Sequence, residues 1–168
     1  MSVDARPSWL AFRLGPERFA VSLERVDEIH AFGDIEPEPG APSPVCGVLR
    51  GTGGRVPVLD LRRRLELADL PVSSRRQRVV AVRAGGRRFG LLVDRVERPI
   101  ELPPTVVRPL PTIARGERSE EVAGLVALRQ GWLILLDVDR LVNAPGLAAE
   151  VSGDPRGPVA RGADNRVE

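Results

Sequence analysis

Apolar residues occur along this chain in pairs of short runs, and a glycine-containing turn separates the two runs of each pair. In the segment 45–65, VCGVLRGTGGRVPVLDLRRRL, one apolar run leads to such a turn, a second run follows, and Asp60 begins a polar stretch. This alternation of runs and turns predicts a β-hairpin. The aspartate predicts a short helix after it, because its side chain can accept hydrogen bonds from the unpaired N–H groups of a first helical turn.

The same pattern returns at 122–142, VAGLVALRQGWLILLDVDRLV. At an offset of 77 residues the two segments agree at six positions, which in the first copy are Val45, Gly47, Gly54, Leu59, Asp60 and Arg63. A second repeat relates 9–26 to 79–96 at an offset of 70, with identities at Ala11, Arg13, Gly15, Arg18, Phe19, Arg25 and Val26. Two blocks repeated in the same order predict two similar halves. The alternative is that hairpins simply resemble one another, since turns select glycine and strands select valine and leucine.

Each half contains about five predicted strands, the right number for a small closed barrel that has no exposed edges. The predicted fold is therefore all-β with short helices. We expect the first barrel at about 9–70 and the second at about 78–142, with elements free to swap between the halves. Residues 1–8 are predicted to be an N-terminal extension. Residues 143–168 lack a sustained core pattern and are predicted to be a flexible tail.

Composition narrows the possible functions. With 42% hydrophobic residues, the 168-residue chain can bury one substantial core or two small ones. All 25 basic residues are arginine, but 23 acidic residues reduce the net charge to +2. Aromatic residues, which stack on bases in many nucleic-acid binders, make up only 4% of the chain. The arginines therefore favour solvated faces, and an SH3-like nucleic-acid binder is the less favoured alternative.

Groups that perform catalysis are scarce, because the chain has one histidine, one cysteine, no tyrosine and no lysine. The single Cys46 excludes an intramolecular disulfide and a multi-thiolate zinc site, and its apolar strand predicts a buried small hydrophobe. His30 has no second histidine with which to form a metal site. The glycines of GTGG are not followed by the Lys-Ser/Thr pair of a phosphate-binding loop. We predict no catalytic residues, no metal and no cofactor.

The N-terminal sequence MSVDARPSWLAFRL has no apolar stretch behind a basic start, so it does not predict a signal peptide. No window approaches the ~20 apolar residues that a membrane-spanning helix needs. We therefore expect a cytoplasmic protein.

Five segments together resemble the CheW family of bacterial chemotaxis coupling proteins and cover about 9–142: FRLGPERFAVSLERVDEI, VCGVLRGTGGRVPVLDLRRRL, VVAVRAGGRRFGLLVDRVERPI, VVRPLP and VAGLVALRQGWLILLDVDRLV. The most specific feature is the ordered combination of V-x-E-I, P-V-x-D-L and G-x-x-V-D-x-V. The resemblance implies two SH3-like five-stranded β-barrels packed on a shared hydrophobic core. It also implies a non-catalytic adaptor that binds the cytoplasmic tips of chemoreceptors and the regulatory domain of a CheA-type histidine kinase in receptor arrays.

The resemblance carries over a set of receptor-binding positions. Val26 and Glu28 match the V-x-E of V-x-E-I, while Val79 and Gly90 match positions in the second half that line the receptor groove. We expect Val26 and Val79 to bury against a receptor helix and Glu28 to orient that helix. The resemblance assigns no kinase-binding residues in this chain.

The main departure from the family lies before the P-V-x-D-L element, where the usual N-L-R-G is replaced by Arg50, Gly51, Thr52 and Gly53. Thr52 therefore stands at the usual arginine position. Arg50 lies two residues away, on the same face of an extended strand. Its long side chain is therefore expected to reach the surface that the family's arginine occupies, and to pair there with Glu28 or a receptor carboxylate. The contrary interpretation is a surface arginine that contributes little. The departure also keeps open a divergent CheW-like regulator that binds only the receptor or only the kinase.

Overall fold

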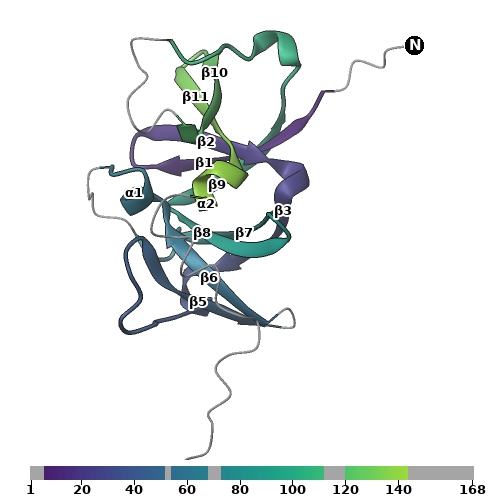
Figure 1. The fold of residues 1–168 in the computed structure, drawn as a ribbon. Coiled ribbons are helices and arrows are strands. Elements are labelled where there is room, and N and C mark those ends of the chain that lie inside the picture. The colour runs from purple at the N-terminus through teal and green to yellow at the C-terminus, as the bar shows by residue number, and fades with distance from the viewer. Residues whose placement is uncertain (1–5, 52–53, 68–72, 112–119, 144–168) are drawn as a thin grey trace, which may run out of the picture.

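The computed structural model describes residues 6–51, 54–67, 73–111 and 120–143 (Figure 1). The strands are β1 Ser8–Leu14, β2 Glu17–Ser22, β3 Val26–Ala31, β4 Ile35–Glu36, β5 Val45–Gly51, β6 Gly54–Asp60, β7 Arg78–Ala84, β8 Arg87–Val93, β9 Arg95–Glu101, β10 Val122–Leu128 and β11 Gly131–Leu136. The helices are α1 Leu61–Arg64 and α2 Val138–Val142, with 3-10 turns η1 Leu23–Arg25, η2 Phe32–Asp34 and η3 Pro104–Val106. The prediction of an all-β chain with short helices is confirmed.

Within the described residues the strands form two sheets, with the orders β10-β11-β2-β1-β9 and β3-β7-β8-β6-β5-β4. The two sheets do not divide the chain into 9–70 and 78–142, because elements have swapped between the halves, which the prediction left open. The β1–β2 hairpin of the first half lies between β11 and β9, and the β7–β8 hairpin of the second half lies between β3 and β6. The halves have therefore exchanged their hairpins, and the second sheet gains the two-residue β4 as a sixth strand.

The sequence repeat is also a repeat of hydrogen bonding. In the first sheet β11 runs parallel to β2 with Leu135 opposite Ala20, and in the second sheet β6 runs parallel to β8 with Val58 opposite Gly90. Leu135 follows Val58 by 77 residues and Gly90 follows Ala20 by 70, the same offsets as in the sequence. The two sheets are thus equivalent in register as well as in strand order.

Turn and cap chemistry explains where these elements begin and end. Gly85 and Gly86 form the two-residue turn between β7 and β8 with φ of 57° and 74°, the left-handed values that a tight hairpin turn of this kind requires. The Asp60 carboxylate caps α1 by accepting from the backbone N–H of Arg62 at 3.0 Å. Asp137 caps α2 in the same way, accepting from the N–H of Arg140 at 3.3 Å. Both capped helices follow their hairpins as predicted.

Three hydrophobic clusters hold the sheets together. The largest draws on both sheets and both α-helices, and its largest side chains include Phe12, Phe19, Leu61, Phe89 and Leu141. Two smaller clusters each draw on the strands of one sheet: one contains Ala11, Ala20, Leu102, Val126, Leu133 and Leu135, and the other Leu49, Val56, Val58, Val79 and Leu92. Because successive residues of a strand face opposite ways, a strand such as β1 contributes to a smaller cluster with one face and to the shared cluster with the other.

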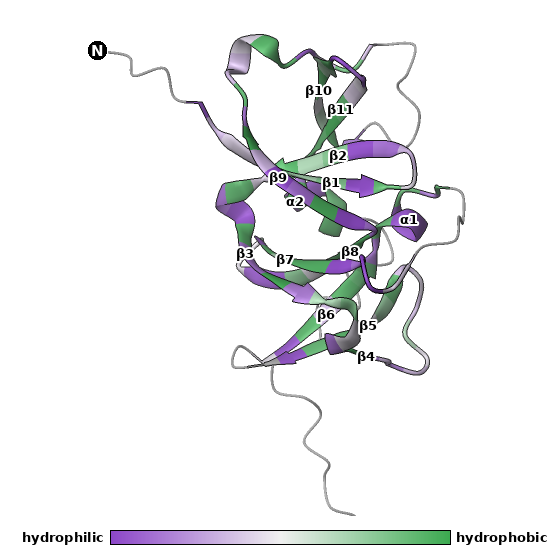
Figure 2. Cartoon of the chain, turned by 180° about the vertical axis from the view of Figure 1, so that it is seen from behind, coloured by the Kyte–Doolittle hydropathy of each residue, from purple (hydrophilic) through white to green (hydrophobic). Residues whose placement is uncertain are grey.

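Buried ion pairs tie α1 to distant parts of the chain. Figure 2 shows α1 as hydrophilic, yet the side chains of Arg62 and of Asp94, which follows β8, are each only 11% exposed and form a salt bridge. Asp94 also accepts from the backbone N–H of Gly15 at 2.6 Å. Arg64 donates to Glu121 at 2.7 Å and to the carbonyl of Leu141 at 3.0 Å. These contacts connect α1 with the β1–β2 turn and with α2.

Candidate protein-interaction site

The edge strand β3 and the turn that follows it carry the most exposed apolar side chains near the predicted receptor-binding residues. β3 lies at the end of its sheet and pairs with β7 only, among the described strands. Ile29 is 47% exposed and Phe32 38% exposed, although both are large apolar residues. We call Val26, Asp27, Glu28, Ile29 and Phe32 the β3 strip. An exposed edge strand with apolar side chains is a common docking surface for another protein.

A β-bulge changes which way the β3 side chains point. Val26 lies opposite Val82, but Glu28 lies opposite Ala81, so β3 contains one extra residue at this point. Because a shift of one residue moves a side chain to the other face, Val26 and Glu28 project from opposite faces and not from the shared face that simple alternation predicts. Val26 is half-buried and packs against the shared cluster, while Glu28 is exposed.

The two carboxylates of the β3 strip are held by basic groups nearby. Glu28 lies 3.0 Å from Nε2 of His30 and 3.8 Å from a guanidinium nitrogen of Arg88. Asp27 accepts from Arg83 at 2.8 Å and from Arg88 at 3.2 Å. Such solvent-exposed pairs contribute about 0–1 kcal/mol each. Glu28 can therefore exchange its partners for those of another protein at small cost.

Val79 and Gly90 do not offer side chains to a partner. Val79 is 0% exposed and belongs to the smaller cluster of its own sheet, so the prediction that it buries against a receptor helix is wrong for this structure. Gly90 is buried directly against it: a Cβ on Gly90 would lie 2.7 Å from Cγ1 of Val79 and 3.0 Å from Cγ2 of Val58. The glycine is needed where β8 meets β6 and β7 closely. Both residues shape the barrel and lie beneath its surface.

Arg50 does not reach Glu28. Its guanidinium pairs with Glu36 of β4 at 2.5 Å, because the proline-rich segment brings β4 alongside β5. The predicted Arg50–Glu28 pair is therefore replaced by Arg50–Glu36. The Arg50 side chain remains largely exposed, so pairing with a receptor carboxylate stays a prediction. Thr52, the other residue of this altered segment, lies outside the described residues.

Ile29 and Phe32 are the candidate contacts that the sequence analysis did not single out. Ile29 closes the V-x-E-I motif and Phe32 begins η2. For Ile29 the sequence does carry a signal: it is a large apolar residue that directly follows two charged residues, Asp27 and Glu28, in the same predicted strand. Two further large apolar residues are exposed: Val106 in the 3-10 turn η3, and Trp132 in β11 of the other sheet.

The remaining candidate chemistry gives no reactive centre in the described part of the chain. Cys46 is only partly buried, but burial and then the charge of Asp60 raise the pKa of its thiol to about 11, so it stays protonated at neutral pH. No group of three or more His, Cys, Asp or Glu side chains is placed to hold a metal ion among residues 6–51, 54–67, 73–111 and 120–143. None of the helices in these ranges is both long and apolar enough to cross a membrane.

Comparison with known proteins gives consistent matches over most of the chain. Residues 8–146 match the family model of the CheW-like domain. The chain is 32% identical over 141 residues to a chemotaxis protein CheW of Klebsiella aerogenes, covering 83% of this chain and 84% of that protein. It is 30% identical over 147 residues to protein FrzA of Myxococcus xanthus, covering 85% and 91%.

A solved structure has the same fold. The scaffolding protein TtCheW from Thermoanaerobacter tengcongensis matches with a TM-score of 0.76 at 22% identity, over 84% of this chain and 91% of that one. This likeness confirms the predicted fold of two SH3-like barrels on a shared core.

Proposed function

The chain belongs to the CheW-like family, and from that membership we propose that it is a chemosensory signalling adaptor that couples a chemoreceptor to a CheA-type histidine kinase. In this proposal it carries out no reaction of its own and works in the cytoplasm, associated with receptor arrays. Its partners are the cytoplasmic tip of the receptor and the regulatory domain of the kinase. Binding, and not chemistry, is then the task that its surface has to perform.

The main structural support for the proposal is that the β3 strip exposes apolar side chains on an edge strand. Ile29 and Phe32 supply apolar area that a receptor helix can cover, and apolar area removed from water contributes about 25 cal/mol per Å2. Glu28 lies on the same edge strand but projects from the face opposite to Ile29, and its exposed carboxylate can pair with a basic residue of the receptor and fix its orientation. Val26 sits at the base of the strip, packed against the shared cluster. Arg50 is a second candidate for an ionic contact with the receptor.

The test is a pair of binding measurements on Ile29→Glu, one with a receptor-tip fragment and one with the kinase regulatory domain. Ile29 is a sharper choice than Val26, because Val26 also packs against the shared cluster and its replacement would disturb the fold. We expect Ile29→Glu to weaken receptor binding by at least about tenfold, or ~1.4 kcal/mol, through lost apolar contact and a new unpaired charge. Binding to the kinase domain should be unchanged.

The matched control is Val106→Glu, which makes the same kind of change at an apolar residue of the 3-10 turn η3, 40% exposed against the 47% of Ile29. This variant should bind the receptor fragment as the parent does. Equal receptor binding by the parent and Ile29→Glu would reject the β3 strip as the receptor site. Binding of the parent to only one of the two partners would reject coupling in favour of a regulator that uses a single partner.

A further inference from the structure

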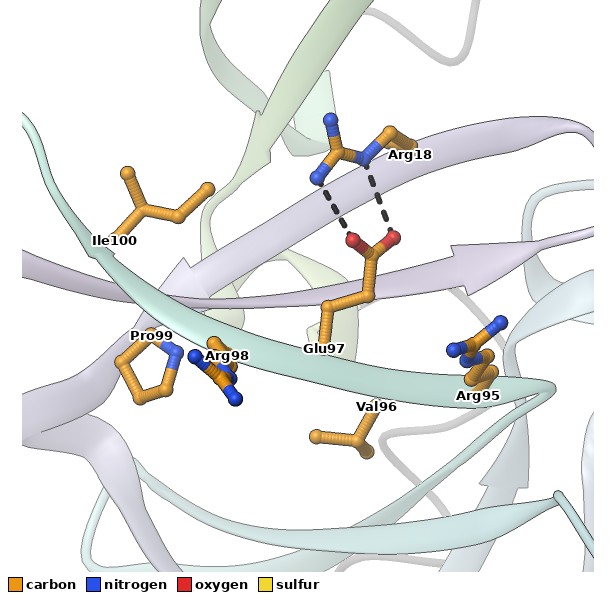
Figure 3. Close-up of a pocket in the computed structure, with 7 residues that line it drawn as sticks. All are labelled: Arg18, Arg95, Val96, Glu97, Arg98, Pro99 and Ile100. Atoms are coloured by element: carbon orange, nitrogen blue, oxygen red, sulfur yellow. Dashed lines mark hydrogen bonds and ion pairs between the residues drawn. The ribbon is translucent and has the colours of Figure 1, made fainter.

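A basic depression lies on β9, on the sheet that does not contain the β3 strip. It has a volume of about 640 Å3 and is lined by Arg18 of β2 and by residues 95–100 of β9 (Figure 3). β9 is an edge strand, and no described strand pairs with its second edge. The depression therefore combines an open surface with a strand edge that can accept another extended segment.

Arginines outnumber carboxylates in this depression. Glu97 accepts from Nη2 of Arg18 at 2.7 Å and from Nε of Arg13 at 2.9 Å, so its carboxylate is already shared between two guanidiniums. Figure 3 shows Glu97 joined to Arg18, with Arg95 and Arg98 on either side of it along β9. Arg95 and Arg98 are exposed, and no described residue forms an ion pair or a hydrogen bond with the side chain of either. Two guanidiniums thus bind the Glu97 carboxylate, and two more arginines lie beside Glu97 on the same strand.

Glu97 has no capacity to neutralise the two remaining arginines. Burial by itself would raise the pKa of this carboxyl, but the hydrogen bond and charge of Arg18, and then those of Arg13, outweigh burial and lower it. The Glu97 carboxyl is therefore ionised at neutral pH, and its single negative charge is already paired with Arg18 and Arg13. Arg95 and Arg98 are therefore left to the solvent, and their positive charge favours an anionic group of a bound molecule at this place.

The lining favours a peptide over a nucleic acid. Val96, Pro99 and Ile100 place apolar surface next to the guanidiniums, and no aromatic ring lines the depression to stack on a base. An extended peptide matches both features, because its alternate side chains can point toward the cations and toward the apolar surface. We propose that the β9 depression binds an extended acidic segment of a partner protein, with Arg95 and Arg98 as the residues that recognise its carboxylates.

The experiment measures fluorescence anisotropy of a labelled (Glu-Val)4 peptide titrated with the full chain. This probe is neither a receptor nor a kinase fragment, so the result is independent of the proposed coupling function. We expect saturable binding that weakens as the salt concentration rises from about 50 to about 300 mM, because the contacts are ionic. Arg95→Gln/Arg98→Gln should weaken binding by at least about tenfold. The matched control Arg75→Gln/Arg76→Gln removes the same charge from an exposed turn and should bind as the parent does.

Three results would overturn the proposal. The first is equal binding by the parent and Arg95→Gln/Arg98→Gln. The second is an equal loss in both double variants, which would show attraction to net charge alone. The third is a result with another probe. A (Gln-Val)4 peptide that binds as well as (Glu-Val)4 would show that carboxylates are not recognised. A labelled oligothymidylate that binds more tightly, and whose binding depends on Arg95 and Arg98, would show that the ligand is a nucleic acid. Circular dichroism of both variants checks that the fold is retained, as expected for exposed side chains without described partners.

Discussion

Asp94 is the aspartate of the G-x-x-V-D-x-V motif, and its contacts predict a role in stability. Its carboxylate lies 2.9 Å from Nε of Arg62 and 2.6 Å from the backbone nitrogen of Gly15. Asp94→Asn keeps the shape of the side chain but removes the charge opposite a buried guanidinium. Breaking a buried pair by removing one partner costs about 3–5 kcal/mol. Since the amide oxygen can still accept one hydrogen bond, we expect a loss of about 2–4 kcal/mol in the free energy of unfolding.

The assay is urea unfolding, with the slope m compared between variants so that a change in midpoint can be read as a change in stability. The matched control is Asp139→Asn, which removes the same charge from the exposed pair that Asp139 forms with Arg25 at 2.8 Å. The side chains of this pair are 42% and 45% exposed, so the control should lose only about 0–1 kcal/mol.

A double variant tests the physical reason for the loss. Arg62→Met/Asp94→Leu removes both charges, so no unpaired guanidinium remains in the interior. The free energy of unfolding of this double variant should be within about 1–2 kcal/mol of the parent value. The remaining loss is expected because the backbone N–H of Gly15 no longer has the Asp94 carboxylate as its acceptor. If Asp94→Asn lowered the free energy of unfolding no more than Asp139→Asn does, the Arg62–Asp94 pair would contribute no more to stability than an exposed pair, in contradiction to its burial.

Three further predictions concern other sites. Gly90→Ala should lower stability by about 1–3 kcal/mol in thermal unfolding, because its new Cβ would lie 2.7 Å from Val79, and adding Val79→Ala should restore part of the loss; an unchanged midpoint would contradict this packing. Because Arg18 and Arg13 lower the pKa of Glu97, its stabilisation is present above the unfolded pKa of about 4.3 and disappears as pH falls through the folded value. Glu97→Gln should therefore flatten the fall in stability between about pH 5 and pH 3, and an identical profile would count against the pairing. The Cys46 thiol, with its pKa of about 11, should react with iodoacetamide at pH 8 about 100-fold more slowly in the folded chain than in urea, and equal rates would contradict its burial.

The sequence was sufficient to predict the repeat, the hairpins and the two capped helices, because each depends on residues close together in the chain. Glycine at the Gly85–Gly86 turn and aspartate at Asp60 and Asp137 determine local conformation directly. A swap of elements between the halves was allowed by the prediction, but which hairpins exchange could not be predicted in the same way. The β1–β2 and β7–β8 hairpins are similar in sequence, and which partner each one joins depends on long-range packing.

The candidate site was predicted less completely, for reasons that can be traced to particular residues. The bulge between Val26 and Glu28 breaks the regular alternation of a strand, so these two residues of one motif project from opposite faces. Val79 matches a groove position by resemblance, but its burial depends on the close approach of Gly90, which only three-dimensional packing reveals. Arg50 pairs with Glu36 because β4, which follows η2, lies beside β5. The proline-rich sequence at 37–44 did not indicate that β4 and β5 would pair. Local patterns thus located Val26 and Glu28 of the β3 strip, but neither its exposed apolar residues Ile29 and Phe32 nor the contacts of Val79 and Arg50.

The most direct test of the adaptor proposal is sedimentation velocity on a mixture of the chain, a receptor-tip fragment and the kinase regulatory domain. We expect one complex that contains all three components, and with Ile29→Glu a complex that has lost the receptor fragment alone. Mutually exclusive binding of the two partners, or a complex that never contains one of them, would contradict it.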